Sequence, residues 1–426
     1  MIQIKHIRIE KKQGKARLAA DIIVPPKAMD AWMFKCPDSG MKSRYHRDFA
    51  DKSGNFTLWY EVDESNADSL CPERADAFVV ACLYYAMITG EDIHCDVPVT
   101  DKLLYQLSEY LIPALCGKDD TTKRIKIIAD ADEMVISNRK FVGTGVSCGV
   151  DSFSTILLNM KDSIPDRFKL THLTLFNTGS MNFVGYSKGE SLEQWRATTE
   201  KEFKERIAIG KAVAKELNLG FIAIDSNIPD LYQGCFMMSN TYRNCSAVLA
   251  TQKMWRTYYY ASAGEKPQMH LDLKEDNDRY DAFLLQAISL DGLTFYSGGL
   301  PYERMDKTAS ISDNAVVQKY LNVCSFETEN CGKCEKCLRT MMALDLLGKL
   351  DLFKDSFHDM TFYYGNKWKY RAIIMEADES KPMYYNMKAY MKRNGIKLNT
   401  KSKVYHYFLP LRILWTKAHR IWGAKK

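Results

Sequence analysis

Long apolar runs are missing from this 426-residue sequence, since no stretch approaches the ~18 uncharged apolar residues that a membrane-spanning helix requires. An export signal is missing too, because residues 1–10 alternate polar and apolar side chains instead of placing an apolar run after a basic one. Low-complexity tracts and repeats are absent, and 46% hydrophobic with 26% charged residues is an ordinary globular composition. We therefore expect a folded cytoplasmic protein of two or three domains.

Acidic residues are absent from residues 381–426, which hold twelve Lys and Arg. The rest of the chain carries 47 basic and 53 acidic side chains, so the net charge of +6 belongs to this tail. An acidic body disfavours tRNA as a partner, because tRNA binding calls for a broad basic face. Residues 401–426 mix seven basic residues with aromatic and aliphatic ones, which fits a membrane-surface, protein-partner or nucleic-acid contact, or a helix packed on the body.

The first 138 residues mix strand and helix patterns without a chemical motif, and we interpret them as an accessory α+β domain. Alternation predicts strands at 1–10 and 57–63, and a short strand is expected at 125–130. Helices are expected at 74–88, ending near Gly90, and at 101–115.

From residue 139 the pattern changes to short apolar strands that alternate with helices, which predicts a parallel sheet with crossover helices. The expected strands are 141–146, 170–176, 221–225 and 293–296, and helices are expected through 211–217 and over 244–260. The aromatic residues of the last helix are interpreted as core packing: Trp255, Tyr258, Tyr259 and Tyr260. We place this domain at 139–350 and a C-terminal extension at 351–426.

The cysteine pattern separates into a scattered set and a cluster. Twelve cysteines without an export signal argue against a disulfide framework, because the cytosol keeps thiols reduced. Eight are interpreted as small buried apolar residues: Cys36, Cys71, Cys82, Cys95, Cys116, Cys148, Cys235 and Cys245. The other four fall within fourteen residues: Cys324, Cys331, Cys334 and Cys337.

The clustered cysteines have the composition and spacing of a closed four-thiolate zinc site. Because the protein supplies all four ligands, the metal is expected to be structural. The basic residues Lys333, Lys336 and Arg339 lie where they can offset the net negative charge of Zn²⁺ with four thiolates. An iron–sulfur cluster also takes four thiolates and stays an alternative.

A second motif lies where a predicted strand runs into small residues and then into an apolar helix. Its central part is Ser147-Cys148-Gly149-Val150-Asp151-Ser152. Small residues let backbone N–H groups converge at a helix N-terminus, where the helix dipole stabilises an anion such as pyrophosphate. The alternative is a strand-to-helix turn that needs glycine for its geometry and Asp-Ser for capping.

This segment resembles the PP-loop of the ATP-pyrophosphatase superfamily, whose usual form is Ser-Gly-Gly-x-Asp-Ser, with Cys148 as the departure. Together with the four cysteines it resembles the 7-cyano-7-deazaguanine synthase family of queuosine biosynthesis. Thr241-Tyr242-Arg243-Asn244 and Met305-Asp306-Lys307-Thr308 are similar to two further segments of that family. The resemblance covers residues 139–348 and implies a Rossmann-like sheet of the adenine nucleotide α-hydrolase type with a C-terminal zinc knuckle.

The resemblance also implies an activity, in which ATP activates a substrate carboxylate as an acyl-adenylate and releases pyrophosphate. A nitrogen donor then displaces AMP to give an amide, which some members dehydrate to a nitrile. ATP, Mg²⁺ and Zn²⁺ are the implied cofactors, and the carboxylate is small or protein-borne. Arg243 and Lys307 are expected near phosphate or carboxylate, with ordinary surface solvation as the alternative. Residues 179–189 are a candidate lid, or else a surface loop.

Two other functions remain open from the sequence. The first is a non-catalytic nucleotide-binding or interaction protein in which Cys148 marks a degenerate loop. The second is sulfur transfer to tRNA, which other PP-loop proteins carry out and which the acidic body disfavours. A homodimer is compatible with each of these functions.

Overall fold

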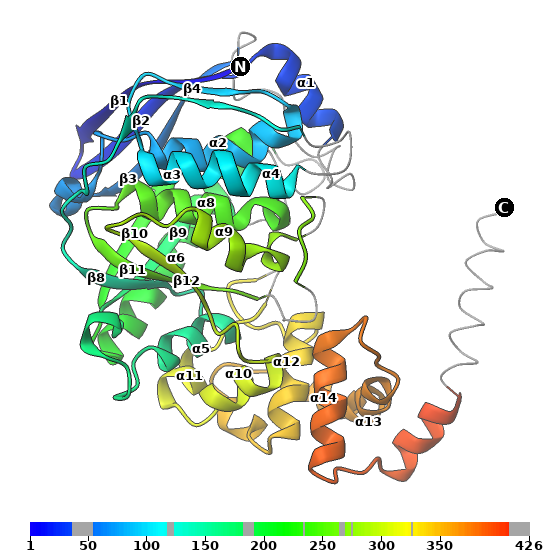
Figure 1. Ribbon diagram of the computed structural model, residues 1–426. Coiled ribbons are helices and arrows are strands. Elements are labelled where there is room, and N and C mark those ends of the chain that lie inside the picture. The colour runs from blue at the N-terminus through cyan, green and yellow to red at the C-terminus, as the bar shows by residue number, and fades with distance from the viewer. Residues whose placement is uncertain are drawn as a thin grey trace. The chain divides into compact units, whose positions relative to one another are not determined.

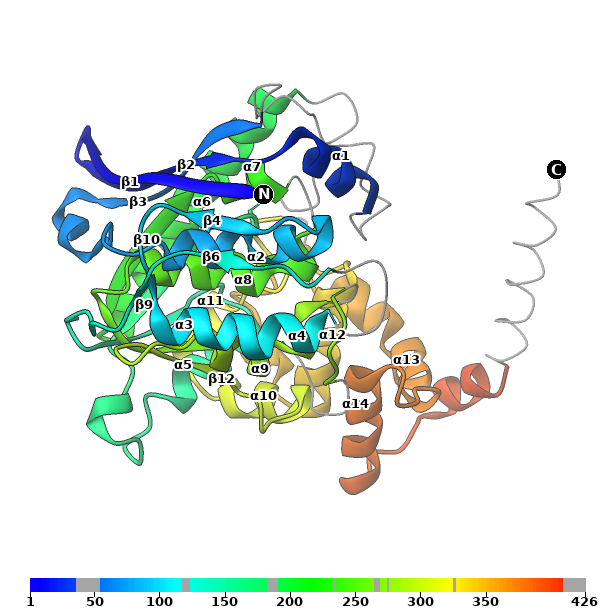
Figure 2. The ribbon, with the colours of Figure 1, turned by 45° about the horizontal axis from the view of Figure 1, so that its top comes forward.

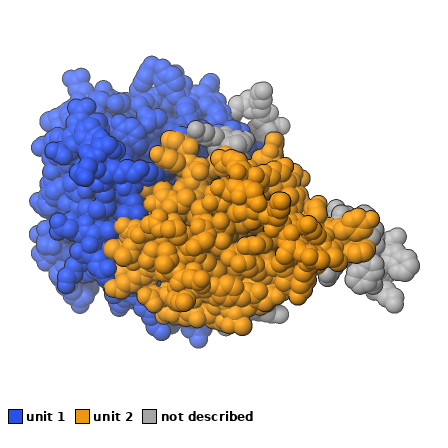
Figure 3. Space-filling view, turned by 90° about the horizontal axis from the view of Figure 1, so that it is seen from below, with its two compact units in different colours: residues 1–147, 155–300 blue, residues 148–154, 301–426 orange. Residues whose placement is uncertain are grey.

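The computed structural model describes residues 1–35, 54–116, 123–181, 191–232, 235–263, 269–273, 276–324 and 327–408. The chain forms two compact units, which Figure 3 shows in different colours. Unit 1 contains residues 1–147 and 155–300, and unit 2 contains residues 148–154 and 301–426. The domain boundaries expected at 138/139 and 350/351 do not coincide with the boundaries of these units.

A ten-stranded sheet runs through unit 1 in the order β12-β11-β8-β9-β10-β3-β2-β1-β4-β6 (Figure 1). Pairing is parallel from β12 to β10, antiparallel from β10 through β3 and β2 to β1, and parallel again from β1 to β6. The mixed α/β class with a mainly parallel central sheet is therefore confirmed. The strands are β1 (Ile2–Lys12), β2 (Lys15–Ile23), β3 (Asn55–Asp63), β4 (Ile93–Cys95), β6 (Ile127–Ile128), β8 (Phe141–Gly145), β9 (His172–Asn177), β10 (Gly220–Ser226), β11 (Trp255–Ala261) and β12 (Thr294–Gly298). Two further short strands, β5 (Val99–Thr100) and β7 (Ala131–Asp132), pair separately.

The N-terminal strands belong to the same sheet as the later ones. The junction is the antiparallel pairing of β10 with β3, where Asp225 lies opposite Glu61 and Ser226 opposite Tyr60. The Tyr60 hydroxyl also donates a hydrogen bond to Ser246 Oγ at 2.7 Å, and both side chains are buried. Residues 1–138 therefore share a hydrophobic core with the later strands, because one continuous sheet needs cover on both faces.

Helices cover both faces of the sheet (Figure 2). Every residue of α2 is buried, and this helix ends at Gly90, whose φ of 75° is the left-handed conformation that the sequence predicted for a C-terminal glycine. Ile222 and Ile224 of β10 join the core that contains α2 and α8, whereas Phe221 and Ala223 face the small core under α6. The helices are α1 (Pro26–Lys35), α2 (Asp76–Thr89), α3 (Asp101–Gln106), α4 (Ile112–Leu115), α5 (Val150–Leu158), α6 (Leu192–Glu216), α7 (Ile228–Tyr232), α8 (Phe236–Ala250) and α9 (Asp281–Ala287).

The helix predicted over 244–260 is wrong in its second half. Helix α8 ends at Ala250, a turn follows, and residues 255–261 form strand β11 between β8 and β12. The segment Trp-Arg-Thr-Tyr-Tyr-Tyr is rich in aromatic and β-branched residues, which favour a strand, but an apolar run does not separate a buried helix from a buried strand by periodicity. Trp255 and Tyr258 are buried, so their expected role in the core is confirmed on a different element.

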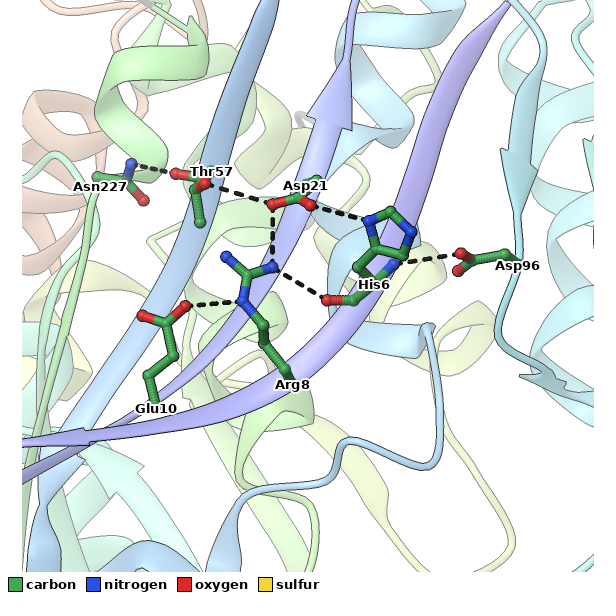
Figure 4. A network of polar contacts seen from close by, with 7 residues as sticks. All are labelled: His6, Arg8, Glu10, Asp21, Thr57, Asp96 and Asn227. Atoms are coloured by element: carbon green, nitrogen blue, oxygen red, sulfur yellow. Dashed lines mark hydrogen bonds and ion pairs between the residues drawn. The ribbon is translucent and has the colours of Figure 1, made fainter.

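The outer side of the antiparallel strands carries a polar network (Figure 4). Asp21 on β2 accepts hydrogen bonds from Arg8 Nη1 at 2.9 Å and Thr57 Oγ1 at 3.4 Å, and its second oxygen lies 3.0 Å from His6 Nδ1. Arg8 also donates to Glu10 at 2.7 Å. Opposite charges on neighbouring strands therefore neutralise one another on this partly exposed face, as is usual for an antiparallel sheet with one buried side.

Unit 2 is helical in its described residues after 301. Its helices are α10 (Arg304–Ile311), α11 (Ala315–Tyr320), α12 (Glu335–Leu346), α13 (Thr361–Met375) and α14 (Pro382–Arg393), and residues 400–408 are also helical. Across the described ranges of both units, none of the helices combines the length and apolarity needed to cross a membrane.

The scattered cysteines match their expected role with one exception. Cys71, Cys82, Cys95, Cys148 and Cys245 are buried and form no disulfide, and Cys116 is half-buried and forms no disulfide. Cys235 is buried but disulfide-bonded, so its interpretation as a free thiol is wrong. Cys36 lies outside the described residues. Spacing alone did not show this bond because disulfide pairing depends on which segments the fold brings together.

Candidate functional site

Four cysteines of unit 2 converge as the sequence predicted. The Sγ atoms of Cys324, Cys331, Cys334 and Cys337 all lie within 4.8 Å of one another, and those of Cys324 and Cys334 are 4.0 Å apart. Tetrahedral bonds of about 2.3 Å from one metal ion would space four sulfurs by about 3.8 Å. The described residues therefore contain four cysteines positioned to bind a metal ion.

Backbone N–H groups around the cluster donate hydrogen bonds to two of the cysteine sulfurs. Cys334 is the residue preceding α12, and its sulfur accepts the backbone N–H of Cys337 at 3.4 Å, while Cys331 Sγ accepts that of Cys334 at 3.3 Å. Gly332 has a φ of 68°, and a Cβ there would lie 2.4 Å from the carbonyl oxygen of Asp359. The turn between the second and third cysteines thus requires glycine.

Asn330 holds the loop that leads into the cluster. Its buried side-chain amide donates to the carbonyl oxygens of Leu321 at 2.7 Å and Ser356 at 3.0 Å, and its oxygen accepts the backbone N–H of Val323 at 2.8 Å. One side chain therefore joins the segment before the first cysteine to the segment after the last. Contacts of this kind orient the ligands of a metal site.

The predicted anion-binding segment follows β8, the strand at which the order of the parallel strands reverses. From β8 the chain proceeds through β9 and β10 on one side, and later through β11 and β12 on the other. In open α/β sheets, ligands bind outside the carboxyl ends of the strands at this reversal. Ser147 after β8 is exposed, Cys148, Val150 and Ser152 are buried, and Gly149 and Asp151 are half-buried.

Asp151 in the first turn of α5 is bound by two cations of α10. Its carboxylate accepts Lys307 Nζ at 3.0 Å on one oxygen and Arg304 Nη1 at 2.8 Å on the other. Burial by itself would raise the pKa of Asp151, but the two positive charges and their hydrogen bonds outweigh it and lower the pKa below its ordinary value. Asp151 is therefore ionised at neutral pH.

Lys307 is buried, with 2% of its side chain exposed, so the alternative of ordinary surface solvation is wrong for this residue. Arg304 was not predicted from the sequence. The sequence did contain a signal for Arg304. Residues three apart on a helix share a face, so the basic residue three positions before Lys307 is a second candidate to bind the same carboxylate.

Two further cations surround this ion pair in unit 2. Lys336 is exposed, and its pKa is lowered first by partial loss of solvent around the ammonium and then by the positive charges of Arg339 and Arg304. The pKa of Arg339 is lowered by burial and by Arg304. Arg304, Lys307, Lys336 and Arg339 outnumber the two carboxylates that act on them, Asp151 and Glu335, which leaves an excess of positive charge suited to an anion.

The two predicted motifs of unit 2 are joined through the backbone. Asn322 N–H donates to the carbonyl oxygen of Cys148 at 2.9 Å, and the Asn322 side-chain oxygen accepts the backbone N–H of Cys324 at 3.2 Å. A single residue thus connects the segment before α5 with the first cysteine, so the order of the cysteine cluster affects the position of that segment.

Cys148 has a left-handed backbone, with a φ of 60°. This conformation favours glycine, which is the usual residue at this position of the PP-loop. We expect Cys148→Gly to keep the free energy of unfolding within about 1 kcal/mol of the original, because relief of backbone strain offsets the lost thiol packing. Cys148→Val should lower it by about 2 kcal/mol or more, since a β-branched residue is strained at positive φ.

Urea unfolding of both variants measures this difference. The matched control is Cys82→Val, a free and buried cysteine in the middle of α2, where the change should cost less than about 1.5 kcal/mol. Equal stability of Cys148→Val and the original protein would contradict the predicted strain.

Arg243 lies in unit 1, on α8, with 2% of its surface exposed. Its Nε donates to Ser239 Oγ at 2.8 Å and its Nη1 to the carbonyl oxygen of Thr178 at 3.4 Å, just after β9. The guanidinium carbon also lies 4.3 Å from the ring centroid of Tyr232, a cation–π contact. Surface solvation is therefore wrong for Arg243 too, and this cation is held at the carboxyl end of β9.

Asp225 is a half-buried carboxyl near the end of β10 that the sequence did not single out. Its Oδ1 accepts Asn177 Nδ2 at 2.8 Å from the end of β9 and the backbone N–H of Ser226 at 2.8 Å. Burial raises the pKa of Asp225 to about 6, against the smaller lowering effect of these hydrogen bonds. The sequence did contain a signal for Asp225, because it lies at the end of a predicted strand, and polar residues at the ends of parallel strands meet at one edge of the sheet.

The raised pKa predicts a pH-dependent effect of Asp225→Asn. The folded state favours the protonated carboxyl, so the original protein keeps its full stability below about pH 4 and loses stability as pH rises through about 6. We expect the substitution to raise the free energy of unfolding by about 2 kcal/mol at pH 8 and by roughly a third of that at pH 4.5, where the unfolded carboxyl is already mostly ionised. Urea unfolding at both pH values is the measurement, with exposed Asp166→Asn as control. A benefit of equal size at both pH values would contradict the prediction.

Two predicted features lie partly outside the described residues. Of the candidate lid at 179–189, only residues 179–181 are described, and of the basic tail at 401–426, only residues 401–408 are described.

No family model, no curated protein and no solved structure matches this chain.

Proposed function

We propose that this chain is an ATP-dependent enzyme that adenylates a substrate carboxylate, releases pyrophosphate and forms a C–N bond, in the manner of the 7-cyano-7-deazaguanine synthase family. The observation that carries the proposal is the contact of Asp151 with Lys307, which joins two motifs 156 residues apart. Both residues were selected from the sequence for the same phosphate chemistry. A chance pair of motifs would have no reason to meet in one buried ion pair.

The strand order supports the finer fold assignment. Numbered from β8, the parallel strands lie in the order 3-2-1-4-5, which is that of the doubly wound nucleotide-binding folds. We propose that the sheet is of the Rossmann-like adenine nucleotide α-hydrolase type, with the nucleotide at the carboxyl end of β8.

The residues of unit 2 suit the pyrophosphate part of ATP. The segment 147–152 would supply backbone N–H groups and the hydroxyls of Ser147 and Ser152, and the four cations would stabilise the negative charge that develops on the leaving pyrophosphate. Asp151 holds Lys307 and Arg304 in fixed positions, so little reorganisation is needed when that charge appears. Mg²⁺ would neutralise phosphate oxygens that protein donors do not reach. Arg243 of unit 1 is the candidate cation for a carboxylate.

We further propose that the metal of the four cysteines is a structural Zn²⁺. A single ion accounts for four sulfurs within 4.8 Å of one another, whereas an iron–sulfur cluster spreads its thiolates over separate irons and needs more room between them. Lys336, which lies between the third and fourth cysteines in the sequence, can offset the negative charge of a four-thiolate site.

An ATP–pyrophosphate exchange assay with a panel of carboxylates tests the proposed activity, and 7-carboxy-7-deazaguanine belongs in the panel as the substrate that the resemblance implies. Exchange that depends on one carboxylate supports the proposal. ATP binding without exchange for any carboxylate would favour a non-catalytic nucleotide-binding protein, and exchange that depends on tRNA would favour sulfur transfer.

A further inference from the structure

A cleft opens within unit 1 at the amino ends of the parallel strands. It is lined by Gln252 before β11, by residues 290–293 before β12, by the start of α3 and by residues between 133 and 138 that lead to β8. Its empty space is about 360 Å³, part of which is open to solvent. Because β8, β11 and β12 are parallel, their amino ends share one edge of the sheet, opposite the edge where β8 leads into Ser147. The cleft is therefore separate from the candidate nucleotide site.

Side-chain hydrogen bonds hold the backbone around this cleft. Arg74 is 3% exposed, and its guanidinium donates to the carbonyl oxygen of Met134 at 3.1 Å and pairs with Asp132 at 2.5 Å. Asn138 Nδ2 donates to the carbonyl oxygen of Gly292 at 2.7 Å, which joins the segment before β8 to the segment before β12. The lining segments are therefore fixed to unit 1 and to each other, as a binding site requires.

The lining of the cleft carries more negative than positive charge. Its acidic residues are Asp101, Glu133 and Asp291. Lys102 neutralises Asp291, because its Nζ lies 2.8 Å from the carboxylate. Asp101 accepts the backbone N–H of Lys102 at 2.6 Å, but neither Asp101 nor Glu133 forms an ion pair with any residue that the structure describes. Two carboxylates are thus left to attract a cation.

Gln252 supplies a hydrogen-bond acceptor inside the cleft. This residue is 5% exposed, and its Nε2 donates to Asp76 Oδ2 at 3.3 Å. Since a carboxylate only accepts hydrogen bonds, the amide nitrogen faces Asp76 and the amide oxygen faces away from it. Among the described residues that oxygen has no donor, yet it is not one of the unpaired polar atoms sealed from solvent. Because Gln252 lines the cleft, its oxygen is available there to a ligand that donates a hydrogen bond.

Apolar side chains complete the lining. Met134 is 66% exposed and Val135 is 58% exposed, and they line the cleft together with the buried Leu290 and Leu293. Exposed apolar side chains on a fixed backbone are suited to cover an alkyl chain, because the contact removes both from water. A bare metal ion would make no use of these side chains, and a phosphate or nucleic acid would be repelled by the carboxylates.

We propose that this cleft binds a primary ammonium group carried on an alkyl chain, supplied either by a free alkylamine or by a lysine side chain of another protein. The three N–H donors of the ammonium are shared between the Gln252 oxygen and the carboxylates of Asp101 and Glu133. The methylene groups lie against Met134 and Val135. This inference does not depend on the proposed enzymatic activity, because the cleft and the candidate nucleotide site lie at opposite edges of the sheet.

Titration of the full chain with n-butylamine at pH 7, followed by NMR of the ligand, tests the proposal. We expect a Kd of about 5 mM or tighter, and binding of 1-butanol, which has the same chain without the charge, at least about tenfold weaker. The double variant Asp101→Asn/Glu133→Gln should raise the Kd for n-butylamine about tenfold, at roughly threefold for each exposed charge. Gln252→Met keeps the side-chain length but removes the acceptor, and should raise the Kd about tenfold.

Glu109→Gln is the matched control, because Glu109 is an exposed carboxylate on the helical turn that follows α3 and does not line the cleft. This variant should bind n-butylamine as the original does. The unfolding transition of each variant verifies its fold. Asp101 and Glu133 are not buried, so the double variant still decides the test if Gln252→Met does not fold.

The peptide acetyl-Gly-Gly-Lys-Gly-Gly-amide separates the two sources of the ammonium. Tighter binding of the peptide than of n-butylamine assigns the cleft to a lysine of a partner protein, and tighter binding of n-butylamine assigns it to a free alkylamine. Absence of binding for both ligands would overturn the proposal. Binding that the double variant leaves unchanged, or equally tight binding of 1-butanol, would also overturn it.

Discussion

Replacing Lys307 with methionine is expected to lower carboxylate-dependent ATP–pyrophosphate exchange by about a hundredfold or more. Methionine keeps most of the length of the buried side chain but removes its positive charge. Lys307 is one of two cations that bind Asp151 directly, so the variant loses a charge from the anion site and leaves the carboxylate with Arg304 alone. Because the charge on the leaving pyrophosphate grows in the transition state, the loss should affect kcat more than KM for ATP.

The controls separate a lost charge from lost structure. Lys349→Met removes a half-exposed lysine of unit 2 that pairs with Asp313, and it should leave exchange unchanged. Arg304→Met should reduce exchange less than Lys307→Met, since the side chain of Arg304 is less buried. Unfolding curves report whether Lys307→Met is folded at the assay temperature. A folded Lys307→Met protein with full exchange would remove the main support for phosphate chemistry at this site.

Replacing Cys334 with serine should abolish metal binding and unfold unit 2 at ambient temperature. Structural zinc sites contribute about 10 kcal/mol or more of binding free energy that is also folding free energy. Cys334 has two roles here, because it is one of the four ligands and its sulfur also accepts the N–H of Cys337 at the start of α12. Loss of the site should also disturb the segment before α5, which Asn322 connects to Cys324.

Elemental analysis of the purified protein and its Cys334→Ser variant measures metal content, and limited proteolysis within residues 301–408 reports unfolding. Cys116→Ser is the matched control, because Cys116 is half-buried, forms no disulfide and lies outside the cluster. This variant should retain one metal per chain and resist proteolysis as the original does. A protein that is well folded yet metal-free after purification without chelator would contradict the assignment of a structural metal.

The sequence determined by itself those features whose cause is local. Alternation predicted β1 and β3, an unbroken apolar run predicted the fully buried α2, and Gly90 marked its end. The spacing of Cys331, Cys334 and Cys337 predicted that the thiols meet, because ligands three residues apart around a helix start are close whatever the rest of the chain does.

The tertiary structure decided what depends on contacts between distant segments. The pairing of Asp225 with Glu61 joined the N-terminal strands to the later sheet. Residues 255–261 form a strand because they pair with β8 on one side and β12 on the other. The burial of Lys307, the role of Arg304 and the left-handed Cys148 likewise required the fold. Local patterns fix the period of a segment and which of its faces is apolar, but partners and exposure are set by which other segments cover that face, and this is a property of the whole chain.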